Sequence, residues 1–443
     1  WLAGVAVLLF AIEDGHGSPV GWICNRNTLI AAGFGVGCLI AHDFWRRERR
    51  SGAFWVALLL WVLSLCSKEA GIATCAYVFA YALWLDESTL WQRFRTLVPY
   101  GAVLVVWRVV RDSLGFGVAN IGFYVDPITD PGQFAMALLE RYPVLLLGQW
   151  GIPSDLSVFY GELLGSRLWW LAVGYVCVLG FLFWPLLRRD RIARFFATGM
   201  LLSVIPICAT FPQDRLLMFV GLGAFGLMVQ FWNAVFAANG PRPSFVLWRA
   251  VAVPVAVLLA SLHVVVAPLL LPTRSAPFKM ARPFYVRGPF DETIVKQDLV
   301  VVNAPVPMFA AYGLFICEHD GMPVPRAVRT LAPGISAVHV RRSDDRTLEI
   351  TPHAGYLNFP DNLFRNEQHR LQRGEQVHLQ RMTATILRLT DDEHGGRPET
   401  VAFRFKEPLE DASFRWLRFH AGQYVPWSPP AVGKEVTLES GWE

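Results

Sequence analysis

The chain has few charged residues and almost no lysine over most of its length. Charged side chains make up 17% of its 443 residues, whereas soluble domains carry about a quarter. Lys68 is the only lysine before Lys279, and hydrophobic residues make up 53%. This deficit excludes a wholly soluble protein. Composition becomes ordinary after Thr273, which predicts a membrane domain over 1–272 and a soluble domain over 273–443.

Other classes of protein are disfavoured by features that the sequence lacks. The net charge is only +4, which gives no reason to expect a nucleic-acid partner. The seven cysteines form no Cys-x-x-Cys pair, so neither a zinc site nor a disulfide framework is predicted. No spacing typical of metal ligands occurs, and Glu13-Asp14 alone is weak support for Mg²⁺ or Mn²⁺. No tetratricopeptide period is visible after Pro272.

The first apolar run, 1–12, is short for a membrane helix. Twelve helical residues rise about 18 Å, whereas the hydrocarbon core is about 30 Å thick. No basic segment precedes the run and no small-residue cleavage site follows it, so it is not read as a signal peptide. We expect that this helix has lost its beginning.

Nine apolar segments predict about nine membrane-spanning helices, although several fall short of about 20 residues. The segments are 1–12, 28–42, 53–66, 70–85, 97–110, 168–187, 195–211, 216–236 and 250–271. Arginines cluster at 46–50, 93–95, 188–194 and 242–249. Short cytoplasmic loops of membrane proteins carry an excess of lysine and arginine. All four clusters fall on one side if 134–151 is interfacial or re-entrant. The C-terminal domain is then extracytoplasmic. The low lysine content and the many arginines favour a bacterial inner membrane.

Polar and ionisable side chains gather at the predicted outer ends of these helices, where each ionised group costs about 2.5–3.5 kcal/mol if it is sunk in lipid. Individually they could neutralise one another or reach the headgroups. Together they predict a pocket in which cations hold phosphate and a carboxylate acts as general base. The residues are Glu13, Asp14, His16, Asn25, Arg26, Lys68, Glu69, Arg108, Arg111, Asp214 and Arg215.

Several short motifs over about residues 1–236 resemble, in this order, the multi-spanning O-mannosyltransferases of the tetratricopeptide-linked type. These enzymes belong to the GT-C class of polyprenol-dependent glycosyltransferases. The motifs are Val20-x-Trp22-Ile23-x-x-Arg26, the Ser67-Lys68-Glu69 step, the arginine-bearing segment 107–115, Pro153-x-x-Leu156-Ser157-x-x-Tyr160, and Pro206 followed by Asp214-Arg215 with Gly221 and Gly223.

The resemblance implies an inverting transferase that takes a sugar from a polyprenyl-phosphate carrier. It implies that Glu13 and Asp14 orient the acceptor or a metal, and that the family's principal catalytic Asp lies upstream of residue 1. The family's Arg-x-Asp reads Arg26, Asn27 and Thr28 here, without the acid. The implied contacts to the lipid phosphate are Arg111, Lys68 and Arg215; Tyr160 and Trp22 offer flat faces, and His16, Asn25, Arg26 and Glu69 complete the substrate-binding set.

The C-terminal residues 273–443 predict one β-rich, sandwich-like and mostly antiparallel domain. Its acidic clusters at His319-Asp320, Asp344-Asp345 and 391–394 sit beside turn residues and are interpreted as solvated loops. The predicted strands are 298–302, 337–341, 347–350, 377–389, 400–405, 414–419 and 436–438.

Three functions stay open at this point. The first is transfer of a sugar from a lipid carrier to a protein or glycan hydroxyl. The second is transport of lipid-linked sugars, which would place ionisable residues near mid-membrane and show an internal repeat; neither pattern is visible. The third is an inactive membrane scaffold with an outer binding domain.

Overall fold

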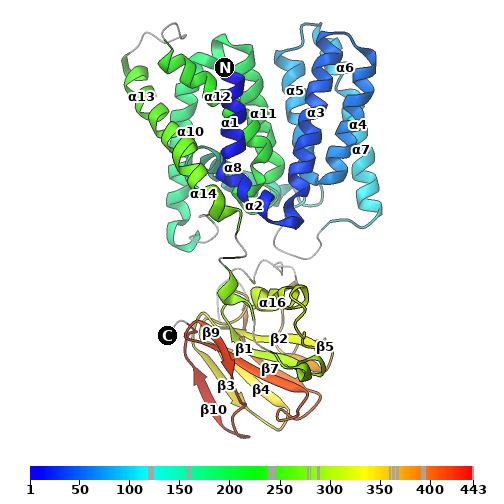
Figure 1. Cartoon of the computed structure of the whole chain (residues 1–443), viewed down its shortest axis with the longest axis vertical. Coiled ribbons are helices and arrows are strands. Elements are labelled where there is room, and N and C mark those ends of the chain that lie inside the picture. The colour runs from blue at the N-terminus through cyan, green and yellow to red at the C-terminus, as the bar shows by residue number, and fades with distance from the viewer. Residues whose placement is uncertain are drawn as a thin grey trace. The chain divides into compact units, whose positions relative to one another are not determined.

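The computed structural model describes residues 1–117, 124–155, 157, 161–237, 246–276, 279, 281–286, 290–358, 361, 365, 369–390 and 396–441, without the side chains of 161–165. The chain divides into two compact units at Pro277 (Figure 1). The first is helical and the second is built on β-sheets. The division falls a few residues later than the sequence predicts, because helix α14 continues through Arg274.

The helical unit is a bundle whose members are joined by short turns. Its helices are α1 (Leu2–Ile12), α2 (Gly17–Gly21), α3 (Asn27–Arg47), α4 (Ser51–Ser67), α5 (Thr74–Trp84), α6 (Leu90–Arg95), α7 (Val98–Ser113), α8 (Pro131–Trp150), α10 (Gly161–Arg189), α11 (Arg191–Ile207), α12 (Met218–Phe236), α13 (Val246–Ala260) and α14 (Ala267–Arg274). Short 3₁₀ turns cover Asp14–His16, Ile23–Asn25, Glu69–Ala73 and Asp214–Leu216.

Four helices of the described chain are long and apolar enough to cross a membrane. They are Ile23–Arg47, Ser166–Arg189, Met218–Phe236 and Val246–Arg274. Leu2–Ile12 and Ser51–Ser67 are apolar but shorter. The predicted span 70–85 is shorter than expected because Glu69–Ala73 forms a 3₁₀ turn before α5. The protein is therefore membrane-associated, and the total of nine spans stays a prediction.

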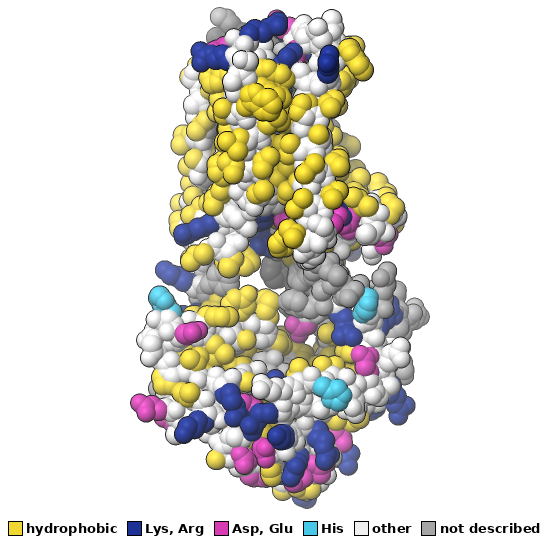
Figure 2. All heavy atoms as spheres, turned by 90° about the vertical axis from the view of Figure 1, so that its right-hand side faces the viewer, with side chains coloured by type: hydrophobic (Ala, Val, Ile, Leu, Met, Phe, Trp, Pro, Cys, Tyr) yellow, Lys and Arg dark blue, Asp and Glu magenta, His cyan; other side chains and the backbone are white. Residues whose placement is uncertain are grey.

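Large hydrophobic side chains cover the outside of the bundle (Figure 2). Trp55 on α4 is 69% exposed, and Val105 on α7 is 63% exposed. A soluble monomer rarely exposes a continuous apolar surface of this kind, so lipid is the surrounding that fits it. Inside the bundle, a Cβ added at Gly223 of α12 would lie 2.5 Å from the Phe196 carbonyl. Only glycine permits this close approach of α11 and α12.

The chain segments before and after helix α8 contact the same connection of the bundle. Before it, the Val125 amide donates to the Ala209 carbonyl (2.8 Å). After it, the Ser154 amide donates to Asp214 Oδ1 (2.7 Å). Both flanks of α8 therefore lie against the segment that leads from α11 to α12. The interfacial or re-entrant arrangement that the sequence suggests for 134–151 stays a prediction.

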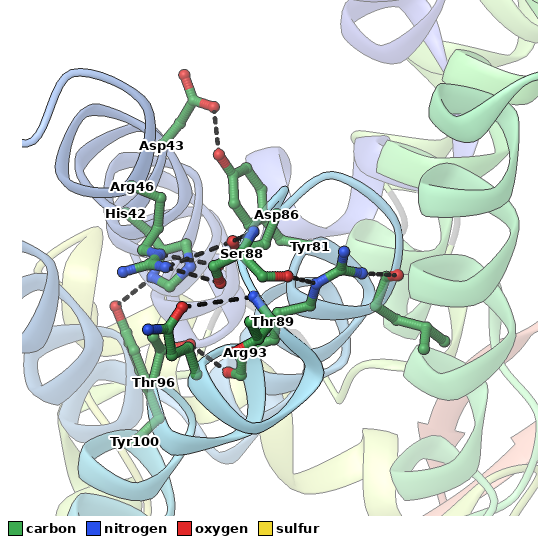
Figure 3. Close-up of polar contacts among 12 residues, drawn as sticks. His42, Asp43, Arg46, Tyr81, Asp86, Ser88, Thr89, Arg93, Thr96 and Tyr100 are labelled. Atoms are coloured by element: carbon green, nitrogen blue, oxygen red, sulfur yellow. Dashed lines mark hydrogen bonds and ion pairs between the residues drawn. The ribbon is translucent and has the colours of Figure 1, made fainter.

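The arginine-rich ends of several helices meet in a network of polar contacts (Figure 3). Arg46 Nε donates to Asp86 Oδ2 (2.8 Å), and the Tyr81 hydroxyl donates to Asp43 Oδ1 (2.9 Å). His42 Nδ1 lies 2.9 Å from the Tyr100 hydroxyl. Because Asp86 is 5% exposed, its charge depends on this pairing. The network joins α3, the α5–α6 connection and α7.

We expect Tyr100→Phe to lower the stability of this end of the bundle by about 1–3 kcal/mol, because it leaves a buried imidazole nitrogen of His42 without a partner. The measurement is the free energy of unfolding in detergent. Tyr142→Phe is the matched control, because the Tyr142 hydroxyl bonds the Leu201 carbonyl at an exposed position. Equal effects of the two variants would contradict the prediction.

The second unit contains two sheets and one main helix. A four-stranded sheet has the order β2-β1-β8-β9, and a six-stranded antiparallel sheet has the order β10-β3-β4-β7-β6-β5. The strands are β1 (Asp298–Ala304), β2 (Ala327–Pro333), β3 (Val338–Arg342), β4 (Thr347–Pro352), β5 (Gln376–Leu379), β6 (Met382–Leu389), β7 (Pro398–Phe405), β8 (Phe414–His420), β9 (Gln423–Pro426) and β10 (Glu435–Leu438), with helix α16 at Pro307–His319.

The prediction of a β-rich C-terminal domain is confirmed, with three differences. First, β1 pairs in parallel with both β2 and β8; α16 provides the crossover from β1 to β2 that parallel strands require, and β8 follows the strands β3–β7 in the chain. Second, the predicted run 377–389 is a hairpin, which turns at Arg381 with a positive φ of 68°. Third, α16, β2 and β9 were not predicted. Val300 and Val302 of β1 share one hydrophobic core with β3, β4, β6 and β7.

Candidate functional site

Three aspartates surround one arginine at the end of α14. Arg274 Nε lies 2.9 Å from Asp14 Oδ2, and its Nη1 lies 2.7 Å from Asp214 Oδ2. The same Nη1 lies 4.0 Å from Asp155 Oδ2. The Ser154 amide and hydroxyl each donate to Asp214 Oδ1 at 2.7 Å. Both carboxylate oxygens of Asp214 are thus hydrogen-bonded, whereas Asp155 lies 4.0 Å from the cation and accepts a backbone hydrogen bond from Asp214.

Close backbone packing brings these residues together. A Cβ added at Gly21 would lie 1.6 Å from the Ser275 carbonyl oxygen, and one at Gly17 would lie 2.8 Å from the Arg274 backbone. Helix α2 therefore packs directly on the end of α14. The turn Asp14–His16 precedes α2, so this packing places Asp14 beside Arg274.

Burial and like charge favour the protonated forms of two of these acids. Burial, with a further contribution from the Asp214 carboxylate, raises the pKa of Asp155 to about 6, although Arg274 opposes the shift. Burial also raises the pKa of Asp14, against the attraction of Arg274. A carboxyl group with a pKa near 6 is suited to accept a proton near neutral pH.

A buried carboxylate–histidine pair lies beside the cluster. Glu13 Oε2 lies 2.9 Å from His263 Nδ1, and the two residues are 250 positions apart in sequence. His263 is 4% exposed and belongs to the π-helical segment Ser261–Val266, which joins α13 to α14. Such π-turns inside α-helices occur frequently at functional sites.

A cavity of about 200 Å³ adjoins both groups. Its polar lining includes Glu13, Asp14, His16, Gln149 and His263, in addition to Asp214 and Arg274. Its apolar lining comes mainly from the α8–α10 connection and from the helix that carries the π-turn; it consists of Ile152, Pro153, Leu217, Leu262, Val266, Ala267 and Leu270. The cavity is a partly polar, partly apolar space within the helical unit.

Two cations lie near each other, and one of them, Arg215, interacts with Asp155 of the acidic cluster. Lys68 Nζ donates to Asn25 Oδ1 and to Thr28 Oγ1, both at 2.6 Å. Arg215 lies over the Trp22 ring at 4.9 Å and donates to Gln213. Within the described part of the chain, neither cation forms an ion pair with a carboxylate, although Arg215 feels the charge of Asp155 at longer range.

The two cations influence each other. Burial, with a further contribution from the charge of Arg215, lowers the pKa of Lys68 to about 8, although Glu69 opposes the shift. Burial lowers the pKa of Arg215. Two partly buried positive charges that destabilise each other form a site that an added anion would stabilise.

Comparisons with known proteins found no match to this chain: no family model, no curated protein and no solved structure is similar to it. The site therefore rests on its own geometry.

Most of the residues that the sequence singled out lie in the same part of the bundle. Glu13, Asp14 and His16 line the cavity. Asn25 holds Lys68. Arg111 Nη2 lies 3.4 Å from Glu69 Oε1, so this arginine is already paired. Arg26 donates to the Val20 carbonyl at an exposed position and is not among the described residues that line the cavity. Tyr160 lies outside the described residues.

The sequence reasoning missed Arg274, Asp155, Gln149 and His263. Arg274 was assigned to the soluble domain because the last apolar run ends at 271. His263 carried a signal that could have found it, since an ionisable residue inside an apolar span indicates function. Among the described residues, no group of three or more His, Cys, Asp or Glu side chains is placed to hold a metal ion.

Proposed function

We propose that the protein is a membrane glycosyltransferase of the GT-C type, which moves a sugar from a polyprenyl-phosphate carrier to a hydroxyl of a protein or glycan. The observation that carries the proposal is the pair Lys68 and Arg215, two partly buried cations whose described partners are neutral. Next to them lies a carboxyl group, Asp155, whose pKa is raised to about 6. An anion site beside a general base is what transfer from a lipid phosphate requires.

The chemistry follows from these positions. Lys68 and Arg215 bind the carrier phosphate through charge-assisted hydrogen bonds. The oxygen of the acceptor hydroxyl forms a bond to the anomeric carbon of the sugar, and Asp155 takes the proton of that hydroxyl. The bond from that carbon to the phosphate oxygen breaks, and its electron pair stays with the phosphate. The two cations stabilise the charge that develops on this leaving group.

The proposal includes the setting in which this reaction takes place. About nine spans would cross a bacterial inner membrane, with the site and the C-terminal β-domain on the outer face. The arginine-rich ends of α3, α6 and α10 support this orientation, since cytoplasmic ends carry the positive charge. The partners would then be membrane lipid, the lipid-linked donor and an acceptor outside the cell.

We expect Lys68→Ala and Arg215→Ala each to weaken binding of polyprenyl monophosphate about 10- to 100-fold, because a hydrogen bond to a charged group contributes roughly 1.5–3 kcal/mol. The measurement is binding of radiolabelled carrier to protein in lipid nanodiscs. Arg191→Ala is the control, since Arg191 pairs with Glu87 at an exposed position. Unchanged binding in Lys68→Ala and Arg215→Ala would remove these residues from the donor site.

Transport of the same lipid is the second candidate, because a flippase would also need an anion site. One set of measurements distinguishes sugar transfer from transport of the carrier. Purified protein in detergent micelles, which contain no second compartment, is given radiolabelled polyprenyl-phosphate hexose together with acceptor peptides or glycans. Release or transfer of the labelled hexose supports the transferase. Intact carrier in detergent, combined with carrier movement across proteoliposomes, would establish transport and overturn the proposal.

A further inference from the structure

Two buried polar side chains in the cavity wall have hydrogen-bonding capacity that the described protein does not use. Gln149, at the end of α8, is 2% exposed, and its side-chain amide makes no hydrogen bond to any described residue. His263 Nε2 is buried and has no partner either. A buried polar group without a partner costs about 1–3 kcal/mol. His263 Nε2 is such a group, and Gln149 adds a buried amide to the same cavity lining, which indicates that a ligand bonds to both.

The charge of the cavity limits what this ligand can be. Three carboxylates line it, and the one arginine among the lining residues is already shared by Asp14 and Asp214. A phosphate would therefore be repelled here, and Lys68 and Arg215 lie outside the lining. A purely apolar ligand would leave Gln149 and His263 unsatisfied. The described residues present no group of three ligands for a metal ion.

The shape and chemistry of the cavity fit a small neutral molecule with several hydroxyl groups. At about 200 Å³, it is smaller than the roughly 300–1,000 Å³ of sites for drug-sized ligands. Leu262, Val266 and Leu270 offer an apolar wall to C–H groups, while carboxylates and amides around them bond hydroxyls. A single sugar ring has both kinds of surface.

We propose that this cavity binds the neutral sugar ring of the donor. Gln149 and His263 form hydrogen bonds with hydroxyl groups of the sugar and do not contact the carrier phosphate. The proposal rests on the proposed function and names its substrate class, a polyprenyl monophosphate that carries one uncharged hexose. Glu13 fixes the tautomer of His263: its carboxylate accepts the Nδ1 proton, which leaves Nε2 as an acceptor for a hydroxyl.

The test compares two probes, polyprenyl monophosphate alone and the same carrier bearing glucose or mannose. Binding of each to nanodisc-embedded protein is measured by competition with radiolabelled carrier. We expect the wild type to bind at least one hexose form about tenfold more tightly than the bare carrier. Gln149→Leu should abolish this preference, while its affinity for the bare carrier stays within about twofold.

A second variant keeps the test decisive if Gln149→Leu folds poorly. Ala267→Leu reduces the cavity with an apolar side chain and should also remove the hexose preference without weakening the bare carrier. Gln133→Leu is the matched control, because Gln133 is an exposed residue in the first turn of the same helix, α8. It should behave as the wild type with both probes.

The outcomes separate the two proposals. The cavity does not bind the sugar if the wild type binds the bare carrier as tightly as both hexose forms, or if the variants lower the affinity for all probes equally. Either result leaves the proposed phosphate site at Lys68 and Arg215 unaffected. If the wild type binds none of the probes, the proposed function fails as well.

Discussion

Asp155→Asn is expected to lower the rate of sugar transfer by about 10²- to 10⁴-fold, the usual contribution of a positioned general base. The amide keeps the size of the side chain and removes its ability to take a proton. Binding of the donor should change little, because Lys68 and Arg215 hold the phosphate. The measurement is kcat for transfer of radiolabelled hexose, together with the affinity for the carrier.

The pH dependence of kcat/KM provides a second readout of the same residue. Asp155 must be ionised to act as base, and its pKa is raised to about 6, so activity should fall as the pH drops below about 6. Lys68 must be protonated to hold phosphate, and its pKa is lowered to about 8, so activity should fall again above about 8. The profile is therefore a bell between these limits.

Asp155→Asn should remove the acidic limb of this profile from any residual activity, and Lys68→Arg should move the alkaline limb upward. Glu87→Gln is the control, since Glu87 is an exposed acid that pairs with Arg191. Full activity of Asp155→Asn, or an acidic limb that persists in it, would show that another group takes the proton. Asp14, whose pKa is also raised by burial, would then be the next carboxylate of the cluster to substitute.

Arg274→Ala has the largest expected effect on stability. The change leaves Asp14 and Asp214 as neighbouring carboxylates without their shared cation, and Asp214 is only 5% exposed. Removing one partner of a buried ion pair costs about 3–5 kcal/mol, because the other charge stays buried and uncompensated. The measurement is the free energy of unfolding in detergent, followed by tryptophan fluorescence.

A rescue experiment tests the cause of this loss. Adding Asp14→Asn and Asp214→Asn to Arg274→Ala removes the uncompensated charges and should recover a large part of the stability. Arg191→Ala removes an arginine from an exposed pair and should change stability by less than about 1 kcal/mol. If Arg274→Ala were as mild as Arg191→Ala, the carboxylate–arginine cluster would not be a structural element of the site.

The prediction of a membrane unit followed by a β-rich unit depends on local properties of the sequence. Runs such as 216–236 and 250–271 are apolar throughout, and each became a helix of the bundle. The charges at Glu13, Lys68 and Asp214 are conspicuous for the same reason, because each interrupts or follows an apolar run. Alternation of apolar residues in 400–405 and 347–350 likewise predicted β7 and β4.

Other features depend on contacts between distant segments, and composition carries no trace of them. The parallel pairing of β1 with β8 joins segments more than one hundred residues apart. Asp155 resembles any loop aspartate in the sequence, and only burial beside Asp214 raises its pKa. Gln149 has no signal at all until the cavity is seen.

The sequence by itself determined which segments are apolar and at which helix ends the charges lie, because hydropathy and charge are properties of neighbouring residues. Tertiary structure alone decided that Arg274 stands between Asp14 and Asp214, and that Glu13 meets His263. The physical reason is steric: glycines at 17 and 21 allow α2 to touch the end of α14, and that contact sets which charges become partners.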